Sequence, residues 1–284
     1  MRKLLIIFVI SILAGTAAYG EETATIPEGK LRLSLIQGPG FTHKRPLVNW
    51  DWGFGAEYGI TDWLNVQFLW NPAVKIRPEV EGGTMFLGLK GGIVGENAPV
   101  PSDRVRLSAA LGILIPPTDK KPDLLDQDQN LWGSALRLYS DFVISRYFYI
   151  NLFFEGDFYP PQRADGNVFY GETVSHYLDL AGEMELNFQT PPLKDGLVLK
   201  YGAPVKIFYA PYMNADGEQA GSQYCLSAGA YFGAALPPKG SPALEWYARY
   251  NTNIMGRNTG PFHRVSFIIR MTLPPGDKEK EGTS

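Results

Sequence analysis

The sequence predicts an all-β protein, a transmembrane antiparallel β-barrel of about twelve strands, and three observations support this prediction. Apolar and polar residues alternate one by one over most of the chain after residue 20. Most of the alternating segments are nine or more residues long, which is the length that a tilted strand needs to cross a bilayer. Glycine and charged residues share the polar parity, so each strand has a bulky apolar face and a face suited to a lumen.

The first 20 residues predict export. Arg2 and Lys3 precede an apolar run from Leu4 to Leu13, and the small residues between Ala18 and Gly20 supply a cleavage site. This is the pattern of a secretory signal peptide, and the run is too short to cross a bilayer as a helix. We therefore expect a cleaved signal peptide over 1–20, a single β-barrel domain over 21–273 and a charged periplasmic tail over 274–284.

The clearest alternation runs from Val48 to Asn71, in the sequence VNWDWGFGAEYGITDWLNVQFLWN. One parity carries bulky apolar side chains from Trp50 to Ile60, whereas the other carries glycine, asparagine and acids. After Thr61-Asp62 the same two-residue period resumes. Because successive side chains of a strand point to opposite faces, this segment predicts a β-hairpin with one apolar and one polar face.

Alternation of this kind predicts twelve strands along the chain. Their spans are 30–37, 48–60, 63–71, 83–95, 104–116, 131–145, 147–158, 173–189, 197–209, 222–236, 243–255 and 263–273. The first of them could instead be a periplasmic arm, which would make the number of strands odd. A soluble exported β-protein would also alternate, but the lumen of twelve strands is too wide for these side chains to fill, so the membrane barrel is favoured.

The predicted connections alternate in length. Thr61-Asp62 and Ser145-Arg146 join their strands closely, whereas the connections after the odd-numbered strands tend to be longer and polar, as over 116–130 and 160–172. A barrel with both termini in the periplasm and its long loops outside the cell has this rhythm.

Aromatic residues gather at the ends of the predicted strands. Tyrosine and tryptophan at such positions are typical of the girdles that lie at the two membrane–water interfaces. The girdle predicted here consists of Trp63, Trp70, Trp132, Tyr147, Tyr149, Trp246 and Tyr247.

The polar parity predicts a lumen with two charged walls. The acidic wall lies on strands 6 to 8 of the predicted order and consists of Asp141, Glu155, Asp157, Asp179, Glu183 and Glu185. The basic wall lies on strands 11, 12 and 1 and consists of Lys30, Arg32, Arg249, Arg264 and Arg270. Facing walls across open water would orient polar solutes, as selectivity linings do. Alternatively, the long side chains meet inside the barrel and plug it as paired charges.

Composition gives no reason to expect a cofactor, a metal or a nucleic-acid partner. The formal net charge is only −3, and the single cysteine, Cys225, cannot form an internal disulfide. His43 and His263 lack the spacing of metal ligands. The acids of the 116–130 segment lack the spacing of a calcium loop, so they indicate a solvated surface loop. These acids are Asp119, Asp123, Asp126 and Asp128.

The hairpin EYGITDWLNVQF, residues 57–68, is similar to the hairpins of bacterial outer-membrane solute-transport barrels, including the FadL-type uptake families for hydrocarbons and aromatic compounds. This resemblance implies an outer-membrane location, insertion by barrel-assembly machinery, contact with membrane lipid and lipopolysaccharide or an equivalent outer leaflet, and passage of small solutes. Two features depart from the FadL pattern. Only about ten residues precede the first strand, too few for a plug domain, and the chain continues past Pro274-Pro275 instead of ending on an aromatic residue.

The favoured function is a narrow channel for passive passage of small polar or amphipathic solutes, with no catalytic residue. One alternative is a non-conducting structural or surface-exposed interaction barrel that uses the loops 116–130 and 160–172. Another is a lipid-modifying barrel enzyme, which would need a serine beside His176 on the apolar parity. Position 178, on the same face, is Leu178, and Ser175 points the other way, so the sequence favours no hydrolytic site.

Overall fold

The computed structural model describes residues 23–42, 45–70, 73–75, 80–81, 85–115, 132–159, 177–213, 219–236, 243–257 and 262–275. The expected signal peptide and most of the expected C-terminal tail lie outside these residues. Within the described ranges, no helix has the length and apolar character of a transmembrane span.

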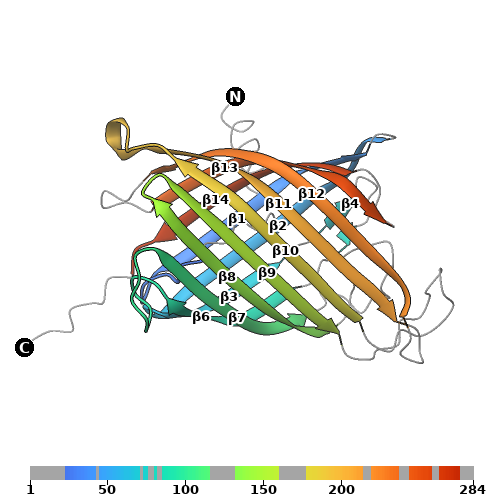
Figure 1. Ribbon diagram of the computed structural model, residues 1–284, viewed down its shortest axis with the longest axis horizontal. Helices are drawn as coiled ribbons and strands as arrows, with labels where there is room; N and C mark the ends of the chain where they lie inside the picture. The colour runs from blue at the N-terminus through green and yellow to red at the C-terminus, as the bar shows by residue number, and fades with distance from the viewer. Residues whose placement is uncertain are drawn as a thin grey trace, which may run out of the picture.

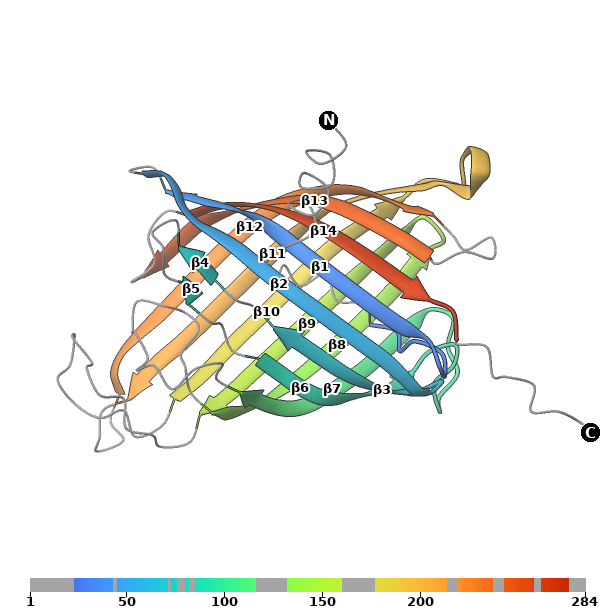
Figure 2. The same cartoon turned by 180° about the vertical axis from the view of Figure 1, so that it is seen from behind.

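Twelve of the strands in the described residues form one closed antiparallel barrel, which confirms the predicted fold class (Figure 1). They are β1 (Leu31–Thr42), β2 (Arg45–Thr61), β3 (Leu64–Trp70), β6 (Met85–Val94), β7 (Val105–Ile115), β8 (Gly133–Ser145), β9 (Phe148–Tyr159), β10 (Tyr177–Gln189), β11 (Val198–Met213), β12 (Gln219–Leu236), β13 (Ala243–Arg257) and β14 (Phe262–Leu273). Each of these twelve strands pairs with the next of the twelve along the chain, so that β3 pairs with β6. The barrel closes because β1 pairs with both β14 and β2 (Figure 2). Two short strands, β4 (Ala73–Lys75) and β5 (Val80–Glu81), extend the sheet beside β2.

The two ends of the barrel differ. We call one the short-turn end, because β2–β3 and β8–β9 turn there within two residues, β1 begins there and β14 ends there. A 3-10 helix, η1 (Lys194–Gly196), connects β10 to β11 at the same end. At the opposite, long-loop end, the connections 116–132 and 160–176 join β7 to β8 and β9 to β10.

The connection between β1 and β2 differs from the expectation. The sequence predicts a strand that ends at residue 37 and a long loop, but β1 continues to Thr42 and only residues 43–44 separate it from β2. The pairing of β1 with β14 skips Gly38 and Pro39 and resumes at Gly40. A Cβ atom at Gly38 would lie 1.7 Å from the carbonyl oxygen of Val265, so glycine is required by close backbone approach inside a strand.

Apolar side chains cover the outside of the barrel, and polar side chains are buried inside it. Leu111 and Ile144 are 65% and 63% exposed, whereas Lys90 and Asn65 are fully buried. A soluble protein has the opposite arrangement, because apolar side chains leave water when such a protein folds. A barrel that faces hydrocarbon on its outside needs the arrangement seen here.

Aromatic rings fill part of the interior beside glycines of the inner parity. On the inner side of β6 to β9, one apolar cluster consists of Phe86, Ala110, Leu114, Ala135, Tyr139, Phe153 and Tyr159. A Cβ atom at Gly112 would lie 2.5 Å from the ring of Phe86, and one at Gly233 would lie 2.5 Å from the ring of Tyr247. The inner glycines therefore make room for rings of neighbouring strands, as well as lining the lumen.

The chain before β1 lies inside the barrel at the short-turn end. We call residues 23–30 the N-terminal segment. Gly29 donates its amide to Gly59 at 2.9 Å, which holds the segment to β2, and Ser108 of β7 donates to the carbonyl of Thr23 at 2.6 Å. Thr23 and Ile26 are each only 1% exposed. These residues therefore occupy part of the lumen near the short-turn end.

Candidate functional site

All the predicted wall residues except Lys30 lie on strands of the barrel, at inner-parity positions. The acidic residues lie on β8, β9 and β10, where five of the six are buried and Asp157 is partly buried. Arg249 is buried on β13, and Arg32, Arg264 and Arg270 are partly buried on β1 and β14. Lys30 lies in the N-terminal segment, directly before β1.

The two walls meet inside the lumen. Nη2 of Arg249 lies 2.6 Å from Oε1 of Glu183, and Nη1 lies 3.2 Å from Oε2 of Glu185. In the sheet, β11 and β12 separate β13 from β10, so these ion pairs span the inside of the barrel instead of following adjacent strands. Paired charges therefore occupy the part of the lumen that lies over β11 and β12 at this level.

Two further acids of the inner parity each hold two cations. Glu57 of β2 and Glu245 of β13 lie outside the predicted acidic wall, although their parity already predicted an inward direction. Their contacts are Arg32–Glu57 at 3.2 Å, Lys90–Glu57 at 3.4 Å, Lys200–Glu245 at 2.8 Å and Arg270–Glu245 at 3.9 Å. Arg137 and Glu155 form a separate buried pair at 2.6 Å. Most of the lumen charge is thus compensated locally, as burial requires.

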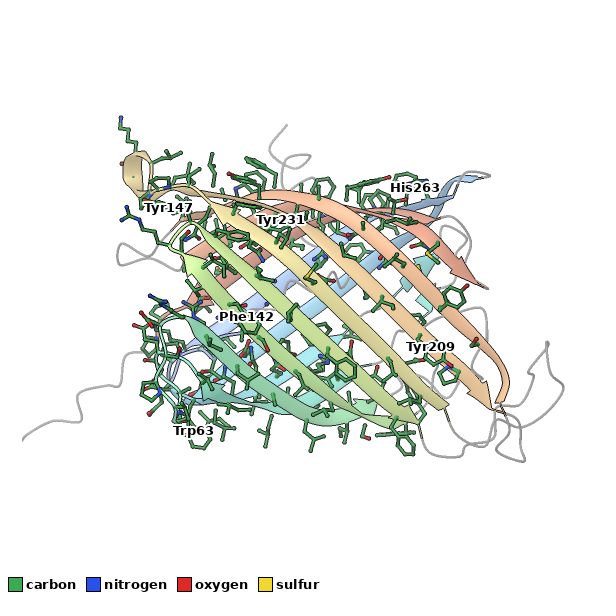
Figure 3. The ribbon with its side chains drawn as sticks, in the orientation of Figure 1. Trp63, Phe142, Tyr147, Tyr209, Tyr231 and His263 are labelled. Carbon is green, nitrogen blue, oxygen red and sulfur yellow. The ribbon has the colours of Figure 1, made fainter. Side chains whose placement is uncertain are left out.

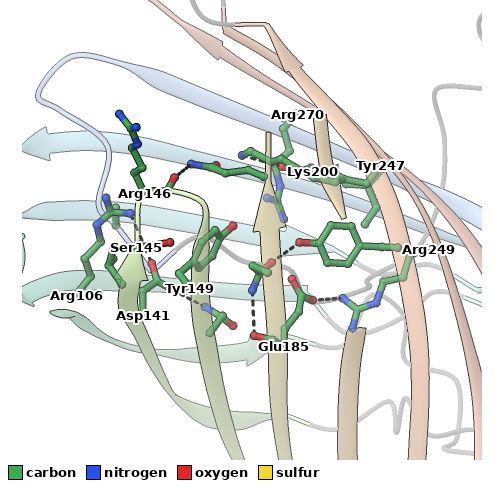
Figure 4. A pocket seen from close by; sticks show the side chains of 17 residues that line it. Arg106, Asp141, Ser145, Arg146, Tyr149, Glu185, Lys200, Tyr247, Arg249 and Arg270 are labelled. Carbon is green, nitrogen blue, oxygen red and sulfur yellow. Dashed lines mark hydrogen bonds and ion pairs between the residues drawn. The ribbon is translucent and has the colours of Figure 1, made fainter. Parts of the chain in front are cut away.

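A cavity of about 410 Å³ lies between the Arg249–Glu185 pair and the short-turn end (Figure 4). Its charged lining contains more cations than anions: Arg106, Arg146, Lys200, Arg249 and Arg270 against Asp141 and Glu185. Its remaining lining includes tyrosine, amide and aliphatic side chains, notably Tyr149, Tyr231, Tyr247, Asn151, Asn187, Val143 and Ile268. The cavity therefore combines positive charge with carbon surface.

Tyr149 and Tyr247 belong to this cavity, which corrects their predicted place in the aromatic girdle. Lys200 donates to the Tyr247 hydroxyl at 3.2 Å, and that hydroxyl donates to Glu245 at 2.7 Å. Tyr149 shares its parity with Asn151 of the same strand, which also lines the cavity. Both tyrosines lie near strand ends, as girdle residues do, but their parity turns them inward.

The other predicted girdle residues lie at or near the ends of the barrel wall. Trp63, Trp70, Trp132 and Trp246 are exposed, and Tyr147 is partly exposed at the β8–β9 turn. Figure 3 shows Trp63 and Tyr147 on different sides of the barrel at its short-turn end. Stacking between Phe148 and Phe188, at 4.7 Å between ring centroids, adds aromatic surface near Tyr147.

The N-terminal segment forms part of the cavity wall, a feature that sequence analysis missed. Ala24 lines the cavity. The Thr23 hydroxyl donates to Asp141 at 2.7 Å, and Asn151 donates to the Thr23 hydroxyl at 3.1 Å. Lys90 donates to the carbonyl of Ala24 at 3.4 Å. The segment thus contacts β6, β8 and β9 at once and narrows the lumen on that side.

The remaining candidates from the sequence lie apart from this cavity or outside the described residues. His263 lies on β14, where Nδ1 is 2.7 Å from the Tyr250 hydroxyl and 3.0 Å from the Thr252 hydroxyl, near the long-loop end (Figure 3). Cys225 is buried on β12. His43, Ser175, His176 and the loops 116–130 and 160–172 lie outside the described residues. Among the residues that the structure does describe, no group of three His, Cys, Asp or Glu could hold a metal.

No protein-family model matches the sequence, and no curated protein matches it significantly. Solved structures match the fold. An outer-membrane channel from Pseudomonas putida F1 has a TM-score of 0.63 at 12% identity, covering 90% of this chain and 99% of that chain. The NanC porin has a TM-score of 0.51 at 7% identity, covering 85% and 99%. The β-domain of the Bordetella autotransporter BrkA has 0.50 at 15% identity, covering 87% and 98%. The fold of this chain is therefore that of the outer-membrane β-barrels.

Proposed function

We propose that this protein is an outer-membrane channel through which small polar or amphipathic solutes diffuse passively. The observation that carries the proposal is the charged cavity of about 410 Å³ inside a closed barrel whose outer surface is apolar. A barrel that served only as a membrane anchor could fill its lumen with packed side chains. Here a space large enough for a small molecule remains, lined by groups that interact with polar solutes.

The passage that we propose is narrow. Arg249 pairs with Glu183 and Glu185 inside the lumen, over β11 and β12, and the N-terminal segment fills part of the lumen at the short-turn end. Solutes would meet charged side chains at close range, so the charge of a solute would affect its passage more than in a wide pore. The outer-membrane location and the periplasmic position of the short-turn end are parts of this proposal.

Single-channel conductance in planar bilayers tests the proposal. We expect a small conductance from folded protein, identified by its heat-modifiable mobility on gels. Replacing Arg264 and Arg270 together by glutamine should change the conductance and shift selectivity towards cations, because two positive charges leave the lumen. Lys194→Gln is the control, since Lys194 is exposed in η1. Folded protein that gives no conductance above background would contradict the channel.

A non-conducting barrel is the second candidate, and the ion pairs of Arg249 inside the lumen favour it. Such a barrel would act through its surface loops. This candidate predicts a conductance no higher than background. It also predicts that protease added to intact cells cleaves the protein within 116–130 or 160–172. A conducting barrel would exclude it.

A further inference from the structure

We infer that the lumen cavity is a binding site for a small organic monoanion, namely a carboxylate carried on a compact apolar body. The inference deepens the proposed channel function and rests on it, because the anion would bind at this site during its passage. Three properties of the cavity lead to this ligand class: the sign of its charge, the arrangement of its cations, and the carbon surface between them.

The charge of the lining favours an anion. Five cationic side chains line the cavity, against the carboxylates of Asp141 and Glu185. Lys200 and Arg270 are held by Glu245, which is not among the lining residues, so the cations and not their acid contact the cavity. Because charges interact more strongly in a lumen partly screened from water than in bulk solvent, a cationic solute would be disfavoured at this site.

The cations lie on two sides of the cavity. Arg106 and Arg146 belong to the β7–β9 side, and Lys200 and Arg270 belong to the β11–β14 side, with Tyr149 between the two groups (Figure 4). The Arg106 side chain is 42% exposed and its Nη1 lies 3.8 Å from Asp141, beyond hydrogen-bond distance. A guanidinium has five N–H donors in a planar fork that fits a carboxylate in bidentate geometry. Arg106 is therefore placed to bind an incoming carboxylate.

Carbon surface distinguishes an organic anion from an inorganic one. Tyr149, Tyr231, Val143 and Ile268 contribute to the lining between the cations. The Tyr231 hydroxyl already donates to Asn187, so the ring is the part of Tyr231 that remains for a ligand. Burial of an apolar body against this surface would add affinity that chloride or phosphate could not gain. At about 410 Å³ the cavity is at the lower end of the usual range for ligand sites, which selects a compact body.

Cyclohexanecarboxylate and cyclohexanecarboxamide test the inference, because they share size and shape but differ in charge. Isothermal titration calorimetry on the folded, full-length mature barrel in detergent should show binding of the carboxylate and at least tenfold weaker binding of the amide. In planar bilayers the carboxylate should reduce the chloride current in a saturable manner. Equal binding of both probes, or no binding of either, would overturn the inference.

Matched variants locate the site. Arg106→Gln should weaken carboxylate binding at least tenfold. Among the lining cations with a described ion pair, Arg106 has the most exposed side chain, and the substitution removes its charge. Arg104→Gln makes the same change two residues away, at an exposed position outside the lining, and should bind like the unmodified protein. Lys200→Gln provides a second test from the opposite side of the cavity. Folding is checked by heat-modifiable mobility. If Arg106→Gln and Lys200→Gln both bind normally, the site is elsewhere and the inference fails.

The outcomes separate this inference from the proposed function. A barrel that conducts but binds neither probe remains a channel without this site. A barrel that binds the carboxylate selectively but gives no conductance retains the site and contradicts the channel. Competition by chloride or phosphate at concentrations equal to that of the carboxylate would show a general anion site and would overturn the organic-anion assignment.

Discussion

Arg249 of β13 and Glu183 of β10 form an ion pair inside the barrel, with Nη2 and Oε1 2.6 Å apart and side chains that are 3% and 2% exposed. Glu185, two residues further along β10, contacts the same guanidinium at 3.2 Å. One arginine therefore compensates two buried carboxylates on a strand that is not its neighbour in the sheet. This contact links two sections of the wall that are separated by β11 and β12, and it places three paired charged groups inside the lumen at its level.

Removing Arg249 should destabilise the barrel. Arg249→Leu leaves Glu183 and Glu185 without this partner, and breaking a buried ion pair from one side costs about 3–5 kcal/mol. Urea unfolding in lipid vesicles measures the loss. The triple variant in which both acids also become leucine should recover most of it, because no buried charge is then left behind. Arg249→Leu with unchanged unfolding free energy would show that this pair contributes nothing to the fold.

Deleting residues 23–29 should raise the single-channel conductance several-fold. The deletion removes the contacts of Thr23 with Asp141, Asn151 and Ser108, and water would take their place in the lumen. Recordings in planar bilayers, at equal voltage and salt, compare the deletion with the full mature chain. An unchanged conductance would mean that the N-terminal segment does not limit the passage.

A disulfide provides the matched control for the deletion. A Cβ atom at Gly92 would lie 3.3 Å from Oγ1 of Thr25, so cysteines at positions 25 and 92 are placed to form a disulfide. Cys225→Ser removes the competing thiol. The oxidised double-cysteine variant should keep the low conductance of the intact barrel. A rise on oxidation would contradict the position assigned to the N-terminal segment.

Gly112→Ala should destabilise the barrel, whereas Gly91→Ala should not. A Cβ atom at Gly112 would lie 2.5 Å from both the Phe86 ring and the backbone oxygen of Leu87, but at Gly91 it would meet nothing within 4 Å. Overpacking of this kind typically costs about 1–3 kcal/mol. Urea unfolding of the two variants side by side measures the difference. Equal stability of both would contradict the packing of Phe86 against the inner glycines.

A charge placed on the outer wall should be costly in the middle of a strand and tolerated at its end. Leu111 is 65% exposed within β7, and Leu111→Arg should lower the unfolding free energy in vesicles by about 2–4 kcal/mol, since a lipid-facing arginine loses its hydration. Trp132→Arg, directly before the first residue of β8, should cost only about 0–1 kcal/mol because it lies near an interface. Equal costs at both positions would place Leu111 outside the hydrocarbon.

Alternation predicted most of the fold because it depends only on the period of a strand. The hairpin predicted over 48–71 is present as β2 and β3, with the turn at 62–63. Parity also predicted the inward direction of Glu183, Arg249 and Arg270. Side chains still alternate between the two faces of the sheet when the barrel closes. These directions could therefore be predicted without knowing which strands are neighbours.

The sequence did not predict features that depend on contacts between residues far apart in the chain. A tyrosine near a strand end fits both a girdle and a lumen, and Tyr247 is held inward by its packing over Gly233 and its contacts with Lys200 and Glu245. The N-terminal segment is fixed by Ser108 and Asp141, which follow Thr23 by 85 and 118 residues. Which acid meets Arg249 depends on the stagger of strands around the barrel, and alternation does not specify that stagger.

Single cysteines on β9, in a Cys225→Ser background, test most directly whether this barrel faces lipid outside and water inside. Leu152 and Phe154 are exposed on the outer face, whereas Tyr149 and Asn151 line the cavity. In barrels inserted into vesicles, a fluorophore at 152 or 154 should be quenched by brominated lipid, and cysteines at 149 and 151 should react with a charged, water-soluble thiol reagent. Quenching by lipid at 149 and 151, with aqueous labelling at 152 and 154, would contradict the orientation of the wall and the channel proposed for its lumen.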